Sequence, residues 1–127
     1  MTQKEMIEKI IKTLDSKRAE DIQVIGIKDL TILADYFIIA NGTSNTHTKT
    51  LAEEVEFQLS QVGIEPRRRE GDNGNTWITL EYADIIVHVF YKETRNFYQL
   101  EKLWADGEQL DISEYITEEN WFDFDWY

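Results

Sequence analysis

Apolar residues near the start of the chain recur at helical spacing. Between residues 2 and 18 they fall on one side of a helix, with charged residues on the other side. This pattern predicts an amphipathic helix that covers one face of a sheet. The apolar positions are Met6, Ile7, Ile10, Ile11 and Leu14.

Two further helices are expected from capping signals. The first covers residues 45–62, because a Gly-Thr-Ser turn at 42–44 precedes it and Gly63 follows it. The second begins at Thr94 as its cap. Its core stripe is expected to be Phe97, Leu100 and Trp104, with Tyr98 turned outward.

Five runs rich in β-branched and aromatic residues predict strands. They cover residues 21–27, 35–40, 64–71, 77–82 and 85–91. The first two are separated by too few residues for a crossover helix, so we expect them to pair antiparallel. Residues 64–71 contain the only proline, as an edge strand allows. The run at 85–91 is apolar on both faces apart from His88, which is typical of a central strand.

These elements predict an α/β fold with one compact domain, in which helices pack on the faces of a mixed five-stranded sheet. A length of 127 residues with 42% hydrophobic content is sufficient for one core. We expect the domain to cover residues 1–106 and an acidic, aromatic tail to cover residues 107–127. The sequence leaves three roles open for the tail: docking on its own domain, swapping onto a neighbouring copy, or binding a basic partner.

Charge narrows the class of partner. The net charge is −12, and half of this excess lies in six acids within the last 17 residues. A broad grip on phosphate is disfavoured, whereas a basic protein partner is attracted. The chain has no cysteine, which excludes disulfides and thiolate sites. No apolar run resembles a signal peptide or a membrane span, so a cytoplasmic protein without membrane contact is expected.

Candidate catalytic groups are sparse. Asp35, Glu81 and Asp84 could meet at one end of the sheet and hold a divalent cation for nucleotidyl transfer. The paired acids that such chemistry needs on the strand after a Gly-Ser turn are missing. His47 is expected to be exposed, and His88 is interpreted as a core imidazole that a neighbouring acid or hydroxyl satisfies.

Arg67, Arg68 and Arg69 leave a direct RNA-binding protein as an alternative. In a strand these side chains alternate between faces, and Glu65 and Glu70 stand beside them. A solvated edge strand is therefore favoured over an RNA site.

Four segments together carry a family resemblance. They are D-Y-F-I-I-A-N-G-T-S at 35–44, R-x-E-G at 68–71, W-I-T-L-E-Y-A-D-I-I-V-H-V-F at 77–90 and R-N-F-Y-Q-L-E-K-L-W at 95–104. In this order and spacing they resemble the ribosomal silencing factor family, RsfS, also called Iojap-like. Ala83 and Glu81 depart from the glycine and aspartate common in the family's turn.

The resemblance implies a nucleotidyltransferase-like domain without transferase activity, cofactor or metal. It implies a repressor of translation that binds ribosomal protein uL14 on the large ribosomal subunit and blocks association with the small subunit when nutrients are limiting. A homodimer is also implied, and direct sequence-specific nucleic-acid contact is not.

We predict the partner-binding residues from the strand at 77–82 and its neighbours. Trp77 is expected to anchor the contact with Leu80 and Tyr82, because aromatic residues tend to dominate interface energetics. Glu70, Glu81 and Asp84 are expected to complement basic groups of the partner.

Overall fold

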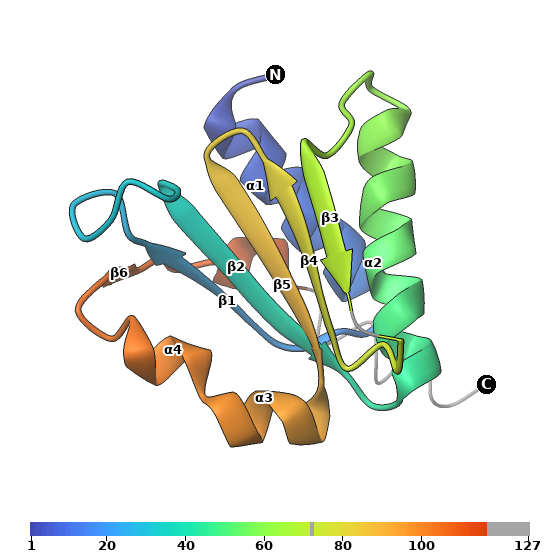
Figure 1. The fold of residues 1–127 in the computed structure, drawn as a ribbon. Helices are drawn as coiled ribbons and strands as arrows, with labels where there is room; N and C mark the ends of the chain where they lie inside the picture. The colour runs from blue at the N-terminus through green and yellow to red at the C-terminus, as the bar shows by residue number, and fades with distance from the viewer. Residues whose placement is uncertain (72, 117–127) are drawn as a thin grey trace.

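A six-stranded mixed sheet in the order β3-β4-β5-β2-β1-β6 forms the centre of the protein (Figure 1). The computed structural model describes residues 1–71 and 73–116. Its elements are α1 (Gln3–Ser16), β1 (Glu20–Gly26), β2 (Tyr36–Gly42), α2 (Asn45–Ser60), β3 (Arg68–Gly71), β4 (Trp77–Tyr82), β5 (Ile85–Tyr91), α3 (Lys92–Tyr98), α4 (Leu100–Leu103), β6 (Glu108–Gln109) and the 3-10 turn η1 (Ser113–Tyr115).

The pairing of the strands follows the hydrophobic pattern closely. β5 and β2 are the two central strands and run parallel, from Tyr36 opposite Ile85 to Gly42 opposite Tyr91. The other neighbours are antiparallel, including β1 with β2 as expected. β3 lies at one edge of the sheet, also as expected. All five predicted strands are present, although the strand predicted at 64–71 is confined to its second half, and a sixth strand, β6, has only two residues.

The two sides of the sheet are covered unequally. We call the side under α1 and α2 the helix face; it holds the larger buried cluster, which includes Ile38, Leu80 and Val87. The opposite side, which we call the open face, holds a smaller cluster that includes Phe37, Ile39 and Phe90. Figure 1 shows α1 behind the sheet, α2 beside β3, and α3 with α4 along the lower edge of the sheet. Among the described residues, α1 and α2 pack only on the helix face, so the open face at β3 and β4 is not covered by either of them.

Local signals explain where the two long helices begin. Thr2 caps α1 by accepting a hydrogen bond from the backbone N–H of Glu5, whose side chain accepts from the backbone N–H of Thr2. Ser44 caps α2 by accepting from the backbone N–H of His47. The bonds at Thr2 and Glu5 are reciprocal, the bond at Ser44 is single, and all of them satisfy donors that have no partner within a helix.

The prediction for the third helix is wrong in two respects: the helix begins two residues earlier than Thr94, and it is interrupted. α3 begins at Lys92 with Tyr91 as its cap, so Thr94 lies inside the helix. Gln99 then adopts a left-handed conformation, with φ 50° and ψ 51°, and separates α3 from α4. Because this residue redirects the chain, the predicted stripe is split: Phe97 is 79% exposed, whereas Leu100 is buried.

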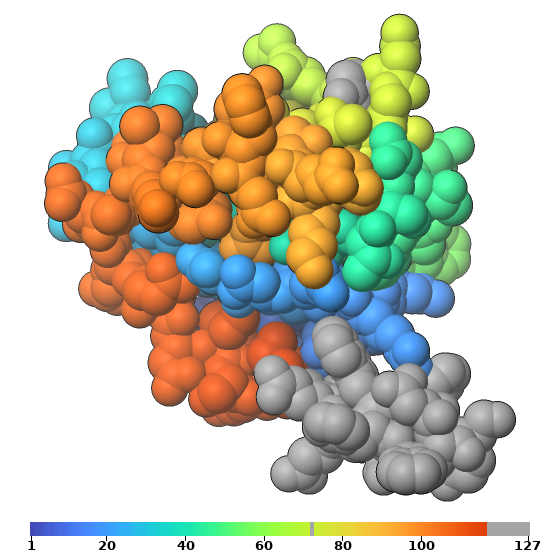
Figure 2. Space-filling model, turned by 90° about the horizontal axis from the view of Figure 1, so that it is seen from below, coloured from blue at the N-terminus to red at the C-terminus, as the bar shows by residue number. Residues whose placement is uncertain are grey.

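Residues 107–116 dock on their own domain. β6 pairs antiparallel with β1, and the backbone N–H of Leu110 donates to Val24 at 2.9 Å. Apolar side chains of this segment pack against the helix-face core; they are Leu110, Ile112, Tyr115 and Ile116. Figure 2 shows the segment in orange-red against the blue N-terminal elements. Residues 117–127, the rest of the predicted tail, and Asp72 of the predicted 72–75 turn lie outside the described residues.

Within the described part of the chain, no helix has both the length and the hydropathy of a transmembrane segment.

Candidate docking surface on the open face of the sheet

β4 distributes the predicted anchor residues between the two faces. Its burial alternates, with Trp77, Thr79 and Glu81 half-buried on the open face. Leu80 and Tyr82 belong to the helix-face core and are 0% and 1% exposed. A partner cannot reach them while the domain is folded, so the prediction that they form one contact with Trp77 is wrong for these two residues. The reason is the two-residue period of a strand.

Trp77 is held by aromatic neighbours from two other elements. Its ring centroid lies 4.7 Å from that of Phe90 on β5 and 5.0 Å from that of Tyr98 on α3. Its indole Nε1 donates a hydrogen bond to Nδ1 of His88 at 3.2 Å. Trp77 is therefore fixed in position while part of its surface stays open to solvent, which suits a contact residue.

His88 is buried beneath this surface, with 7% of its surface exposed. The ring of Phe37 meets it edge-on, with centroids 4.7 Å apart. Burial lowers the pKa of His88 from 6.5 to about 4, so the imidazole is neutral near pH 7. Its Nε2 has no hydrogen-bond partner within the described residues. The prediction of an acid or hydroxyl partner is wrong, because the indole of Trp77 occupies that role.

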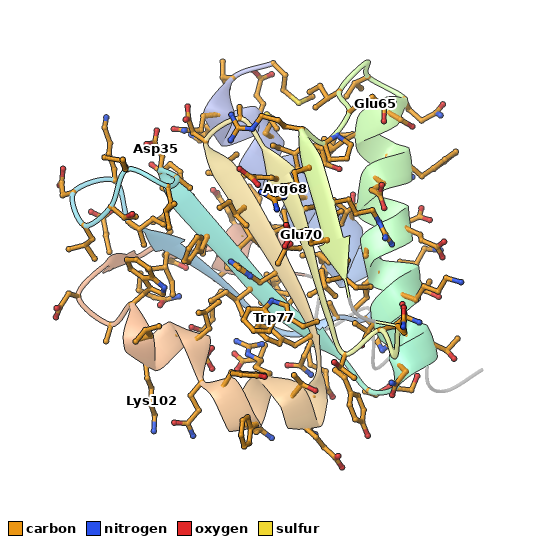
Figure 3. The ribbon with its side chains drawn as sticks, viewed as in Figure 1. Asp35, Glu65, Arg68, Glu70, Trp77 and Lys102 are labelled. Atoms are coloured by element: carbon orange, nitrogen blue, oxygen red, sulfur yellow. The ribbon has the colours of Figure 1, made fainter. Side chains whose placement is uncertain are left out.

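A shallow groove of about 760 Å³ opens beside Trp77. It runs from the β3–β4 hairpin to α3 and is lined by Arg69, Glu70, Gly71, Thr76, Trp77, Thr79, Thr94 and Tyr98. Figure 3 shows Arg68, Glu70 and Trp77 along this side of the sheet. Two of the predicted residues, Glu70 and Trp77, thus share one concave surface.

The charges on this side of the sheet are paired. Arg67 donates to Glu81 with a distance of 2.8 Å between Nη2 and Oε1. Arg68 forms an ion pair with Glu70. Such exposed pairs contribute about 0–1 kcal/mol each, so a partner can exchange them at low cost.

The third arginine borders the groove but forms its ion pair with α2. Arg69 pairs with Glu56 of α2, with 2.7 Å between Nε and Oε1. All three arginines of the Arg67 to Arg69 run therefore have acidic partners. This arrangement removes the uncompensated basic strip on which an RNA-binding reading would depend.

Asp84 lies at the far end of β4 from Trp77, in the turn between β4 and β5. It is exposed, and its carbonyl accepts from the backbone N–H groups of Asp35 at 2.7 Å and Tyr36 at 3.1 Å. Asp35 and Asp84 therefore meet through their backbones, whereas the metal hypothesis requires their carboxylates to meet; the Asp35 carboxylate accepts from Gln3, and Glu81 is paired with Arg67. Across residues 1–71 and 73–116, no three His, Cys, Asp or Glu side chains are grouped to hold a metal ion.

His47 is half-buried at the start of α2, not exposed as predicted. Its Nδ1 accepts from the backbone N–H of Thr43 at 2.9 Å, and its Nε2 lies 2.7 Å from the carbonyl oxygen of Lys17. These bonds join the end of α1 to the turn before α2. His47 therefore has a structural role and lies outside the open-face groove.

Tyr98 is a member of the site that sequence reasoning missed. It was expected to face outward, and it is 54% exposed, but its contact with Trp77 was not foreseen. The contact depends on α3 starting immediately after β5, which brings the helix across the end of the sheet. The hydrophobic pattern of the strand and the helix does not indicate the contact between Tyr98 and Trp77.

Comparison with known proteins identifies the relatives of this chain. A family model described as "Ribosomal silencing factor during starvation" matches residues 1–123. The ribosomal silencing factor RsfS of Bacillus subtilis is 36% identical over 112 residues, which cover 88% of this chain and 95% of that protein. The mouse mitochondrial assembly of ribosomal large subunit protein 1 is 29% identical over 102 residues, which cover 78% of this chain and 45% of that protein. A crystal structure of a Chromobacterium violaceum protein superposes with a TM-score of 0.79 at 30% identity, covering 87% of this chain and 92% of that one.

Proposed function

Because the chain belongs to the ribosomal silencing factor family, we propose that it binds the large ribosomal subunit through ribosomal protein uL14 and keeps the small subunit from joining. It thereby represses translation when nutrients are limiting. In this proposal the protein acts in the cytoplasm by occupying space and catalyses no reaction. The observation that carries it is the family match over residues 1–123, and relatives in this family are named as silencing factors.

The open face supports a role in docking. It presents a half-buried Trp77 beside a groove of about 760 Å³, which β3, β4 and α3 line. Rigid aromatic residues with one open side are typical anchors of protein interfaces. We therefore place the contact at Trp77, Tyr98 and Glu70.

The charge of the protein supports a basic protein as the partner. A net charge of −12 attracts a basic surface over a distance of about one Debye length, roughly 8 Å at physiological salt. Glu70 borders the groove, Glu81 is half-buried on the open face of β4, and Asp84 is exposed in the turn after β4. They would complement basic groups of uL14, and they would speed encounter more than they strengthen the final complex.

Steric blocking requires little contact area. A standard interface buries about 800 Å² on each partner, and the whole protein exposes 7750 Å². About a tenth of the surface is thus sufficient for docking, and the rest of the molecule can stand where the small subunit would bind. A homodimer, which the family resemblance also implies, would be detected by light scattering of the purified chain.

The test is a sucrose gradient with purified ribosomal subunits. The protein is expected to travel with the large subunit, and an excess of it is expected to reduce the peak of joined subunits. Trp77→Ala should lose both effects while its circular dichroism stays that of a folded protein. Phe57→Ala is a matched control, since Phe57 is 54% exposed on α2 and lies away from the open face. Subunits that join equally well with and without the protein would refute the proposal.

A further inference from the structure

The hydrogen bond from Trp77 to His88 determines which part of the indole a partner can meet. The indole Nε1 lies 3.2 Å from Nδ1 of His88, and His88 is 7% exposed. The only N–H group of the Trp77 side chain is therefore directed into the protein. What remains on the open face is the carbon framework of the ring.

The tautomer of His88 follows from the same contact. Because Nδ1 accepts the indole proton, the single proton of the neutral imidazole is on Nε2. That Nε2–H is buried and has no acceptor among the described residues. A leucine or phenylalanine would fill this place without leaving a buried donor unsatisfied. The hydrogen bond that Nδ1 accepts from the indole of Trp77 accounts for a buried histidine at this position.

The surroundings leave few other ways to hold the ring. Phe90 and Tyr98 contact the indole through aromatic surfaces, 4.7 Å and 5.0 Å between centroids. Aromatic contacts of this kind constrain a ring but tolerate a flip that exchanges its edges. A hydrogen bond selects one of the two orientations, and His88 Nδ1 is the acceptor that the structure provides.

We propose that His88 is a positioning residue for docking: by accepting the indole N–H of Trp77, it fixes the ring so that an apolar edge faces the partner. This inference rests on the proposed function, because it assigns a role to His88 in the same contact. It also specifies the chemistry of the partner at this point. The partner supplies apolar or methylene surface to Trp77, and it does not accept a hydrogen bond from the indole.

The test uses two substitutions of similar size that differ in one hydrogen-bond acceptor. His88→Asn places its Oδ1 where Nδ1 of the imidazole lies, whereas His88→Leu has no acceptor. The full chain is labelled with ¹⁵N-tryptophan, which gives signals from its four tryptophans. Trp77→Phe assigns the indole signal of Trp77. Exchange of this N–H with solvent and affinity for purified large subunits are then measured for each protein.

In the unmodified protein and in His88→Asn, we expect a protected Trp77 N–H and affinities within about threefold of each other. In His88→Leu, we expect the signal to shift, exchange to quicken at least tenfold and affinity to fall at least tenfold. Urea midpoints identify any loss of folding. Rapid exchange of the Trp77 N–H in the unmodified protein would overturn the inference, as would normal affinity of His88→Leu with a shifted indole signal.

The two proposals fail in distinguishable ways. If the unmodified protein does not bind large subunits, the proposed function is refuted and the docking role of His88 with it. A protected Trp77 N–H that is lost in His88→Leu and kept in His88→Asn would, even then, establish His88 as the residue that orients the ring.

Discussion

Arg95 donates a hydrogen bond to Oδ1 of Asn41 across 2.9 Å, and both side chains are buried. The same Nη1 donates to the carbonyl oxygen of Asp21 at 2.7 Å, where β1 carries an irregularity in its pairing. The Nε atom lies 3.5 Å from Oε1 of Glu101. One buried guanidinium from α3 thus joins β1, β2 and α4.

Replacing this arginine should destabilise the whole domain. Arg95→Ala leaves buried acceptors without a donor, so we expect a loss of about 3 kcal/mol in the free energy of unfolding. Urea denaturation followed by circular dichroism measures it. Arg68→Ala is the control, because the Arg68 pair with Glu70 is exposed and its loss should change the free energy by less than about 1 kcal/mol. Equal effects of the two substitutions would contradict this account.

His88 should make stability depend on pH. Its folded-state pKa of about 4 lies below the ordinary value of 6.5 because of burial. As the pH falls below 6.5, the unfolded chain takes up a proton that the folded chain refuses, so stability decreases until the pH reaches about 4. The shift corresponds to about 3 kcal/mol.

The measurement compares the unmodified protein with His88→Leu in urea between pH 7 and pH 4. Other groups titrate in both proteins, so the difference between them isolates His88. The unmodified protein should lose about 3 kcal/mol more than the variant over this range. Parallel pH profiles would show that His88 titrates normally in the folded state.

Removing acidic groups from the open face should slow binding to the large subunit. Glu70→Gln removes one charge from the groove, and we expect a several-fold lower association rate at low salt with little change in dissociation. The difference should shrink at high salt, because screening weakens steering. Stopped-flow or biolayer measurements at two salt concentrations test this. Glu53→Gln, on the exposed side of α2, provides a charge-matched control; an equal effect of both variants would point to net charge alone.

Gly107 should be intolerant of a side chain. A Cβ atom there would lie 2.6 Å from the carbonyl oxygen of Gly26 and 2.6 Å from a methyl carbon of Ile25. Gly107→Ala therefore has to push β6 away from β1, and we expect a loss of about 1–3 kcal/mol. Thermal unfolding measures the effect. Gly74→Ala is the control, since its Cβ would meet no atom closer than 3.6 Å; comparable melting temperatures for the two variants would contradict the expected crowding.

The sequence predicted the fold well where a single physical signal was sufficient. The nearly unbroken apolar run of residues 85–91 predicted a central strand, and β5 is one of the two central strands. β6 was missed because two residues, Glu108 and Gln109, are too few for a period to appear, and both are polar. Its pairing depends on the chain returning to β1, which is a tertiary event.

The site was harder to predict than the fold. Trp77 could be placed on the open face from the strand period alone, but Leu80 and Tyr82 were grouped with it by chemical type although that period puts them on the helix face. The partnership of Trp77 with His88 could have been inferred from the register, in which Thr79 faces His88 and Trp77 is the diagonal neighbour. Gln99 gives no such signal, because a left-handed glutamine is uncommon and is set by its surroundings.

The parallel pair of β2 and β5 at the centre of the sheet constrains how early the chain can fold during its synthesis. Tyr36 pairs with Ile85, which lies 49 positions further along the chain. A nascent chain that has emerged only as far as β4 still lacks β5, the strand with which β2 pairs in parallel. Folding must therefore wait until nearly three-quarters of the polypeptide has left the exit tunnel, and the finished protein is released from the same kind of particle that we propose it restrains.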